Sequence, residues 1–64
     1  MIDGNAIMAA REYLQDNEFS GLADHLNDKG FKVNAVQAKM IVSEMLKEDG
    51  YSDIEIRKAL EALE

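Results

Sequence analysis

Two four-residue stretches decide the fold of this chain: Asn34-Ala35-Val36-Gln37 and Ser52-Asp53-Ile54-Glu55. Each has the pattern of a capping box, in which the first side chain accepts a hydrogen bond from the backbone N–H three residues later. The Gln or Glu in the fourth position can then reach back to the first residue's own backbone N–H. Both stretches therefore predict that a helix begins, at residue 35 and at residue 53.

The glycines around the first box indicate where helices end. Gly30 lies shortly before the box, and Gly50 follows the apolar run that the box begins. Glycine is common just after a helix because it adopts a left-handed backbone there without strain. We therefore expect one helix to end before Gly30, a second to run from Asn34 to about Asp49, and a last helix to follow Ser52.

Two more helices are expected in the first half of the chain. One spans residues 5–16, with Asp3 or Asn5 as its N-cap, and the other has Ser20 as its N-cap. In all four segments the apolar residues recur three and four positions apart, the period of a helix with one buried face. The residues on these predicted buried faces are Ala6, Ile7, Ala10, Tyr13, Leu14, Leu22, Ala23, Leu26, Ala35, Ala38, Ile41, Val42, Met45, Leu46, Ile56, Ala59, Leu60 and Leu63.

Length and composition indicate one small globular domain over residues 1–64. The chain is 47% hydrophobic and 31% charged, contains no proline, and has no strand-like alternation of apolar and polar residues. We therefore expect an all-α fold, a compact bundle of three to four short helices with a helix-turn-helix-like middle. No apolar run approaches a membrane span, and the N-terminus lacks the leading basic residues of a signal peptide, so a cytoplasmic location is expected.

Enzyme chemistry has little support in the sequence. The single histidine, His25, is adjacent to Asp24, and neighbouring residues on a helix point in different directions, so they cannot form an acid–base pair. The chain has no cysteine, no ligand cluster with metal spacing and no glycine-rich phosphate loop. We therefore expect a protein that is not an enzyme and that binds neither a cofactor nor a metal.

The charge of the chain is acidic but uneven. The net charge of −6 disfavours a nucleic acid or an anionic membrane as the partner, since phosphate binding needs a basic face. Residues 29–43, however, contain Lys29, Lys32 and Lys39 and no acid, so this segment carries +3 and the remainder −9. The segment is either a local positive surface or a chance fluctuation among solvated residues.

Residues 22–45, LADHLNDKGFKVNAVQAKMIVSEM, have the order helix, glycine turn, capped helix. This order resembles a helix-turn-helix, whose second helix enters the major groove of DNA. The GFKVNAVQA run is similar to the turn and recognition-helix start of arginine-repressor-type DNA-binding domains. The alternative interpretation is a plain α-hairpin that serves only for packing.

The helix-turn-helix resemblance implies a specific set of DNA contacts. Asn34, Gln37 and Lys39 would face the groove, and Lys29 and Lys32 would contact phosphate. The predicted second helix contains no arginine, the residue that makes the commonest specific base contact. A DNA-binding regulator is therefore the alternative function, although the negative net charge of the chain disfavours it.

The C-terminal stretch MLKEDGYSDIEIRKALEAL is similar to the helix–Gly-Tyr–helix half of ubiquitin-associated-like domains. In that family the loop of glycine and aromatic residue forms part of a partner-binding surface. The resemblance implies that Tyr51 is an exposed anchor. The alternative is that Tyr51 only staples the last helix by packing against Ile56.

Several apolar residues lie away from the predicted buried faces. Val36 and Met40 are opposite the broad apolar face of their helix, and Met8 and Ile54 are similarly displaced in theirs. Either the helix over 5–16 covers Val36 and Met40, or these residues form a surface for a partner or a second copy. We expect a small acidic protein-interaction module, a regulator or inhibitor of a factor with a basic surface. Its predicted contacts are Val36, Met40, Tyr51 and Ile54.

Overall fold

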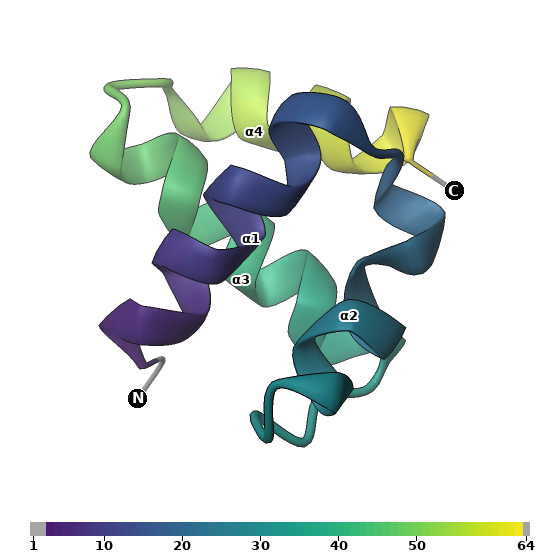
Figure 1. The fold of residues 1–64 in the computed structure, drawn as a ribbon. Coiled ribbons are helices and arrows are strands. Elements are labelled where there is room, and N and C mark those ends of the chain that lie inside the picture. The colour runs from purple at the N-terminus through teal and green to yellow at the C-terminus, as the bar shows by residue number, and fades with distance from the viewer. Residues whose placement is uncertain (1–2, 64) are drawn as a thin grey trace.

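The computed structural model describes residues 3–63, and within that range every regular element is a helix. The all-α fold class predicted from the sequence is confirmed, with 77% of the described residues helical (Figure 1). Met1, Ile2 and Glu64 lie outside the described residues. In chain order, the elements are α1 (Gly4–Asp16), a short 3₁₀ turn η1 (Phe19–Gly21), α2 (Leu22–Asp28), α3 (Ala35–Glu48) and α4 (Asp53–Ala62).

Both predicted capping boxes form. The Asn34 side chain accepts a hydrogen bond from the Gln37 backbone N–H at 2.8 Å, and Gln37 Oε1 accepts from the Asn34 N–H at 2.9 Å. The Ser52 hydroxyl accepts from the Glu55 N–H at 3.3 Å, and Glu55 Oε1 accepts from the Ser52 N–H at 3.2 Å. At the start of α1 the Asp3 carboxylate accepts from the Asn5 N–H at 2.9 Å. The predicted starts of α1, α3 and α4 are therefore confirmed to within one residue.

The glycine ends of α2 and α3 are also confirmed. Gly30 and Gly50 have φ values of +94° and +95°, the left-handed backbone expected of the residue just after a helix. The N–H of Phe31 donates to the Leu26 carbonyl at 3.0 Å, which is the bond of a Schellman motif. Tyr51 makes the equivalent bond to Leu46 at 3.1 Å. At the C-terminal ends of α2 and α3, backbone hydrogen bonds thus satisfy carbonyl groups of the last helical turn before the chain changes direction.

The prediction that Ser20 caps the second helix is wrong. Ser20 lies inside η1, and α2 begins at Leu22 with Gly21 in the N-cap position and no side-chain cap. The Gly21 N–H donates instead to the Glu18 carbonyl at 3.3 Å, and the Leu22 N–H donates to the Phe19 carbonyl. The 3₁₀ turn therefore supplies the backbone bonds that a serine side chain would have made.

Gly21 also lies close to the Tyr13 side chain of α1. The Tyr13 ring stacks on the His25 ring, with centroids 4.4 Å apart and planes inclined by 28°. The Tyr13 hydroxyl lies against Gly21, where a Cβ atom would overlap with it. A side chain at position 21 would therefore displace a tyrosine that the histidine holds in place.

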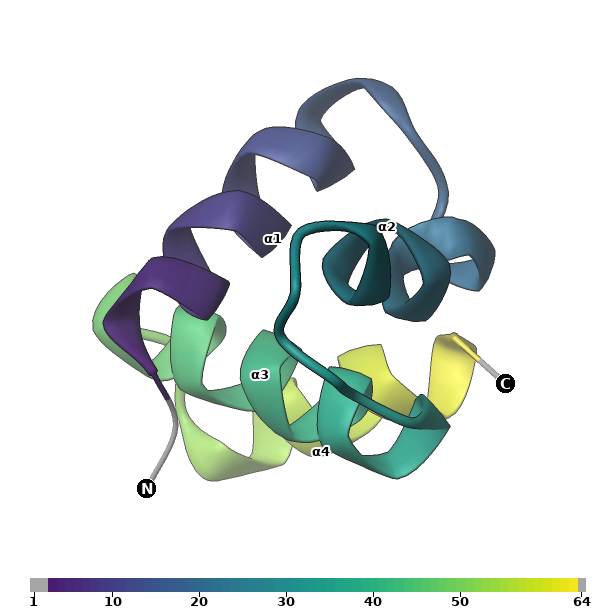
Figure 2. The same cartoon turned by 60° about the horizontal axis from the view of Figure 1, so that its bottom comes forward.

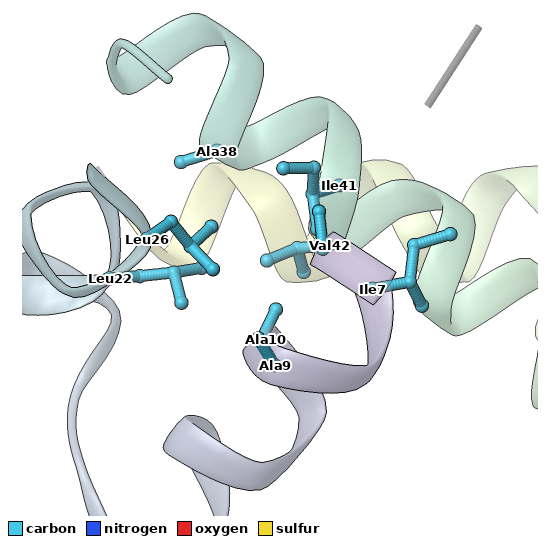
Figure 3. Packing of buried hydrophobic residues seen from close by; sticks show 9 residues of the cluster. Ile7, Ala9, Ala10, Leu22, Leu26, Ala38, Ile41 and Val42 are labelled. Carbon is cyan, nitrogen blue, oxygen red and sulfur yellow. The ribbon is translucent and has the colours of Figure 1, made fainter. Parts of the chain in front are cut away.

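The core lies where α1, α2 and α3 meet (Figure 3). The residues that α1 and the start of α3 contribute to the core are mainly alanines, and their small side chains allow the helices to approach closely. Ala35 was predicted to be buried but is exposed, because it is the first residue of α3 and lies beyond the facing helix turns. The buried residues of the whole described chain are Ala6, Ile7, Ala9, Ala10, Leu22, Leu26, Ala38, Ile41, Val42 and Ile56.

α3 is the central helix of the bundle. It packs chiefly against α1 and α4, while α2 packs chiefly against α1 (Figures 1 and 2). Three helices therefore share the inward side of α3 and leave its outer side uncovered. No helix among the described residues is both long and apolar enough to cross a membrane.

Candidate interaction surface on α3

The outer side of α3 carries two large apolar side chains. Val36 is 67% exposed and Met40 is 52% exposed, although both belong to a helix whose opposite side is buried. The two residues are four positions apart, so they are neighbours on one helix face. The hypothesis that α1 covers them is therefore wrong, because both side chains remain more than half exposed. We call this pair the α3 ridge.

A groove of about 410 Å³ runs beside the ridge. It lies between the first turn of α1, the chain that connects α2 to α3, and α3 itself, and Met40 belongs to both the groove and the ridge. Its surface is mixed, with apolar side chains and a lysine, an aspartate and a glutamine. We call it the turn groove; its lining residues are Asp3, Ala6, Gly30, Phe31, Lys32, Val33, Gln37, Met40 and Ile41.

A second groove of about 350 Å³ separates α3 from α4. It has apolar residues at its base and charges of both signs, and it includes Lys39 and Ser43 of α3. Helical geometry places Lys39 and Ser43 on one side of Met40, and Gln37 and Ile41 on the other. The α3 ridge therefore stands between two depressions. The residues that line the second groove are Lys39, Ser43, Lys47, Asp53, Ile56, Arg57, Leu60 and Glu61.

Asn27 holds the connection between α2 and α3 in shape. Its Oδ1 accepts from the Val33 N–H at 3.0 Å, and its Nδ2 donates to the Val33 carbonyl at 2.8 Å. The same Nδ2 donates to the Ala23 carbonyl at 2.9 Å. The amide thus pairs with both backbone groups of Val33 and fixes one wall of the turn groove. Asn27 was not predicted from the sequence; the available signal was an asparagine three residues before a helix-ending glycine.

Two lysines project from this connection. Lys29 and Lys32 are exposed, and neither forms an ion pair with another residue of the described range 3–63. Lys32 has a φ of +51°, a left-handed backbone that is uncommon for a residue with a Cβ. The turn therefore presents two positive charges at the start of α3, next to the ridge.

The predicted DNA-contacting residues of α3 do not share one surface. The side-chain oxygens of Asn34 and Gln37 are occupied by the capping box. Gln37 lines the turn groove, whereas the partly buried Lys39 lines the groove on the α4 side. The arrangement therefore places Lys39 on a different side of α3 from Gln37, which is bonded to Asn34.

Tyr51 and Ile54 form a different exposed site. Tyr51 is 49% exposed and Ile54 is 67% exposed, and they lie at the connection between α3 and α4. Val36 lies near the opposite end of α3, about 20 Å away at 1.5 Å of rise per residue. The structure thus brings Val36 and Met40 together but leaves Tyr51 and Ile54 apart from them.

The acidic and basic residues of the chain are concentrated in two consecutive segments. Residues 12–28, from the second half of α1 through α2, contain five acids and no lysine or arginine. Residues 29–43 contain three lysines and no acid. The five acids of the first segment are Glu12, Asp16, Glu18, Asp24 and Asp28, and all five are exposed.

No protein-family model, curated protein or solved structure matches this chain. Among the described residues, no group of three or more His, Cys, Asp and Glu side chains is placed to hold a metal ion. The exposed apolar residues and the charge separation are therefore the features from which a function can be inferred.

Proposed function

We propose that this chain is a non-enzymatic protein-interaction module that binds its partner through the α3 ridge. The observation that carries this proposal is the exposure of Val36 and Met40, at 67% and 52%, on the uncovered side of the central helix. Large contiguous apolar patches on a small domain commonly mark a binding site, and the ridge adjoins the apolar residues of the turn groove. Methionine suits such a contact because its flexible, polarisable side chain adapts to different partner surfaces.

The acidic segment 12–28 contributes at longer range. Exposed charges of one sign raise the rate of encounter with a surface of the opposite sign more than they raise affinity. This acidic segment favours a partner that has a basic region outside the element that contacts the ridge. The proposed role is thus that of a small regulator or inhibitor, with Tyr51 and Ile54 as a separate contact for a larger partner.

A pull-down from a lysate of the native host tests the proposal. Immobilised wild-type protein is compared with the double variant Val36→Lys, Met40→Glu, which keeps the net charge unchanged. Met8→Gln is the matched control, because Met8 is also highly exposed but lies on α1. We expect at least one lysate protein to be captured by wild type and by the Met8 variant but not by the double variant. Capture of the same proteins by all three would contradict binding through the ridge.

A DNA-binding regulator is the second candidate function. The exposed Lys29 and Lys32 beside the start of α3 favour it, since lysines at this position of a helix-turn-helix contact phosphate. On this hypothesis wild type binds duplex DNA at about 50 mM salt, and binding weakens steeply as salt rises. Lys32→Glu would weaken it further. Folded protein that binds no duplex at that salt concentration would exclude this candidate, and nuclease treatment of the lysate gives an independent check.

A further inference from the structure

We infer that the partner segment seated on the α3 ridge is an acidic amphipathic helix, an inference that rests on the proposed interaction function and specifies the chemistry of its ligand. The ridge and the turn groove together supply an apolar contact strip. Phe31, Val33 and Ile41 line the groove, and Met40 joins it to Val36. Its volume of about 410 Å³ accommodates apolar side chains from one helix face.

A helix suits this site better than an extended peptide does. Peptides that bind as added strands need an open sheet edge, and the described residues contain no strand. Proline-rich peptides need grooves lined by several aromatic rings, whereas Phe31 is the one aromatic residue of the turn groove. An amphipathic helix needs an apolar groove alone, with anchors at successive turns.

The charges around the ridge select an acidic helix. Lys32 lines the turn groove and Lys29 lies in the same connection, and the 29–43 segment that carries the ridge contains no carboxylate. Asp3 is the one acid that lines the groove, and its carboxylate already caps α1. Carboxylates that flank the apolar face of a bound helix would therefore meet lysines. In the rest of the chain carboxylates outnumber lysines and arginines, so such a helix would meet mainly like charge there.

A second copy of the chain fits the ridge less well. Pairing two α3 ridges would bring the positive segment 29–43 of one copy against the same segment of the other. Like charges brought together at an interface oppose association. Charge complementarity thus points to a partner whose contacting element carries the opposite sign.

Two synthetic peptides of about 16 residues, long enough to form a helix, test the inference. Both have leucines at the i, i+3, i+4, i+7 positions of one face; one has glutamates beside that face and the other has lysines. We expect the glutamate peptide to bind wild type at least about tenfold more tightly by fluorescence anisotropy, a difference of about 1.4 kcal/mol. Equal binding, preference for the lysine peptide, or no binding of the glutamate peptide at millimolar concentration would overturn the inference.

Charge-reversal variants test whether the peptide binds at the α3 ridge. Lys29→Glu combined with Lys32→Glu should weaken binding of the glutamate peptide about tenfold or more. The matched control is Arg57→Glu combined with Lys58→Glu, which makes the same charge change at two exposed positions of α4 and should have much less effect. Circular dichroism confirms that each variant is folded. An equal loss in the variant at positions 57 and 58 would overturn the assignment to the ridge.

The result separates this inference from the proposed function. If a lysate protein requires the ridge but the peptides show no preference for glutamate, the interaction module stands and the acidic helix does not. If the double variant at positions 36 and 40 still captures every lysate partner, the proposed function fails as well. If the wild-type protein is a dimer and the double variant is a monomer, the ligand is a second copy of the chain and the inference is overturned.

Discussion

Arg11 of α1 binds Asp49, the residue that ends α3. One guanidinium nitrogen, Nη1, donates to both carboxylate oxygens of Asp49, at 2.8 Å and 2.9 Å. Nη2 lies 3.5 Å from the Met45 carbonyl oxygen at the same helix end. The pair fixes α1 against the packed side of α3 at the end remote from Val36.

The contribution of this ion pair is expected to be modest because both side chains are more than a third exposed, at 37% and 38%. Removing it with Arg11→Met and Asp49→Asn should reveal a coupling energy of about 0.5–1 kcal/mol in a double-mutant cycle. Urea unfolding at low and high salt measures it, and the coupling should decrease as salt screens the charges. A coupling that is absent at low salt would contradict the role given to this pair.

The capping boxes should contribute measurably to stability. Asn34→Ala and Ser52→Ala each remove a side-chain oxygen that accepts from a helix N–H, so each should lower the free energy of unfolding by about 1 kcal/mol. Ser20→Ala is the matched control, because Ser20 lies in η1 and caps no helix. Its effect should stay within about 0.5 kcal/mol. A larger effect at Ser20 than at Ser52 would show that the helix starts are misplaced.

Asn27 should matter more than an exposed asparagine normally does. Asn27→Ala removes two hydrogen bonds that hold the α2–α3 connection and one within α2, and should lower the free energy of unfolding by about 1–3 kcal/mol. Asn5→Ala is the control, since its amide side chain is exposed near the start of α1. Thermal unfolding followed by circular dichroism compares the two. Equal and small losses would mean that the turn holds its shape without Asn27.

Gly21 should resist even a small side chain. Its φ of −96° is accessible to alanine, so the obstacle in Gly21→Ala is steric overlap with the Tyr13 hydroxyl. Displacing Tyr13 from His25 should lower the free energy of unfolding by about 1–3 kcal/mol. Gly4→Ala is the control, because a Cβ there meets no neighbouring atom and alanine favours a helix. A Gly21 variant as stable as the Gly4 variant would contradict the close approach.

The sequence predicted the helix boundaries where local chemistry decides them. Capping boxes at Asn34 and Ser52 and left-handed glycines at Gly30 and Gly50 depend on residues within one helix turn, so they can be read directly. Ser20 was misassigned because a serine before an apolar run is also compatible with a 3₁₀ turn. In that turn backbone groups satisfy each other.

The candidate site was only half predictable. The position of Val36 and Met40 on the outer face follows from helical periodicity, but their exposure depends on the direction in which α1 crosses α3. That direction is a tertiary property, to which the contact between Arg11 and Asp49 contributes across 38 residues of sequence. The bonds from Asn27 to Val33 likewise require the turn to be formed before the pair can be recognised.

The free energy of unfolding of the Val36→Lys, Met40→Glu variant tests the central claim most directly. The claim is that the α3 ridge is a solvent-exposed surface available for a partner. The two new side chains are four residues apart and of opposite charge, so on an exposed helix face they should change stability by less than about 0.5 kcal/mol. Urea unfolding should therefore give nearly the same midpoint as wild type, from a protein that no longer captures its partner. A loss of several kcal/mol would show that Val36 and Met40 are buried, because charges placed in a core are strongly destabilising, and it would contradict the account.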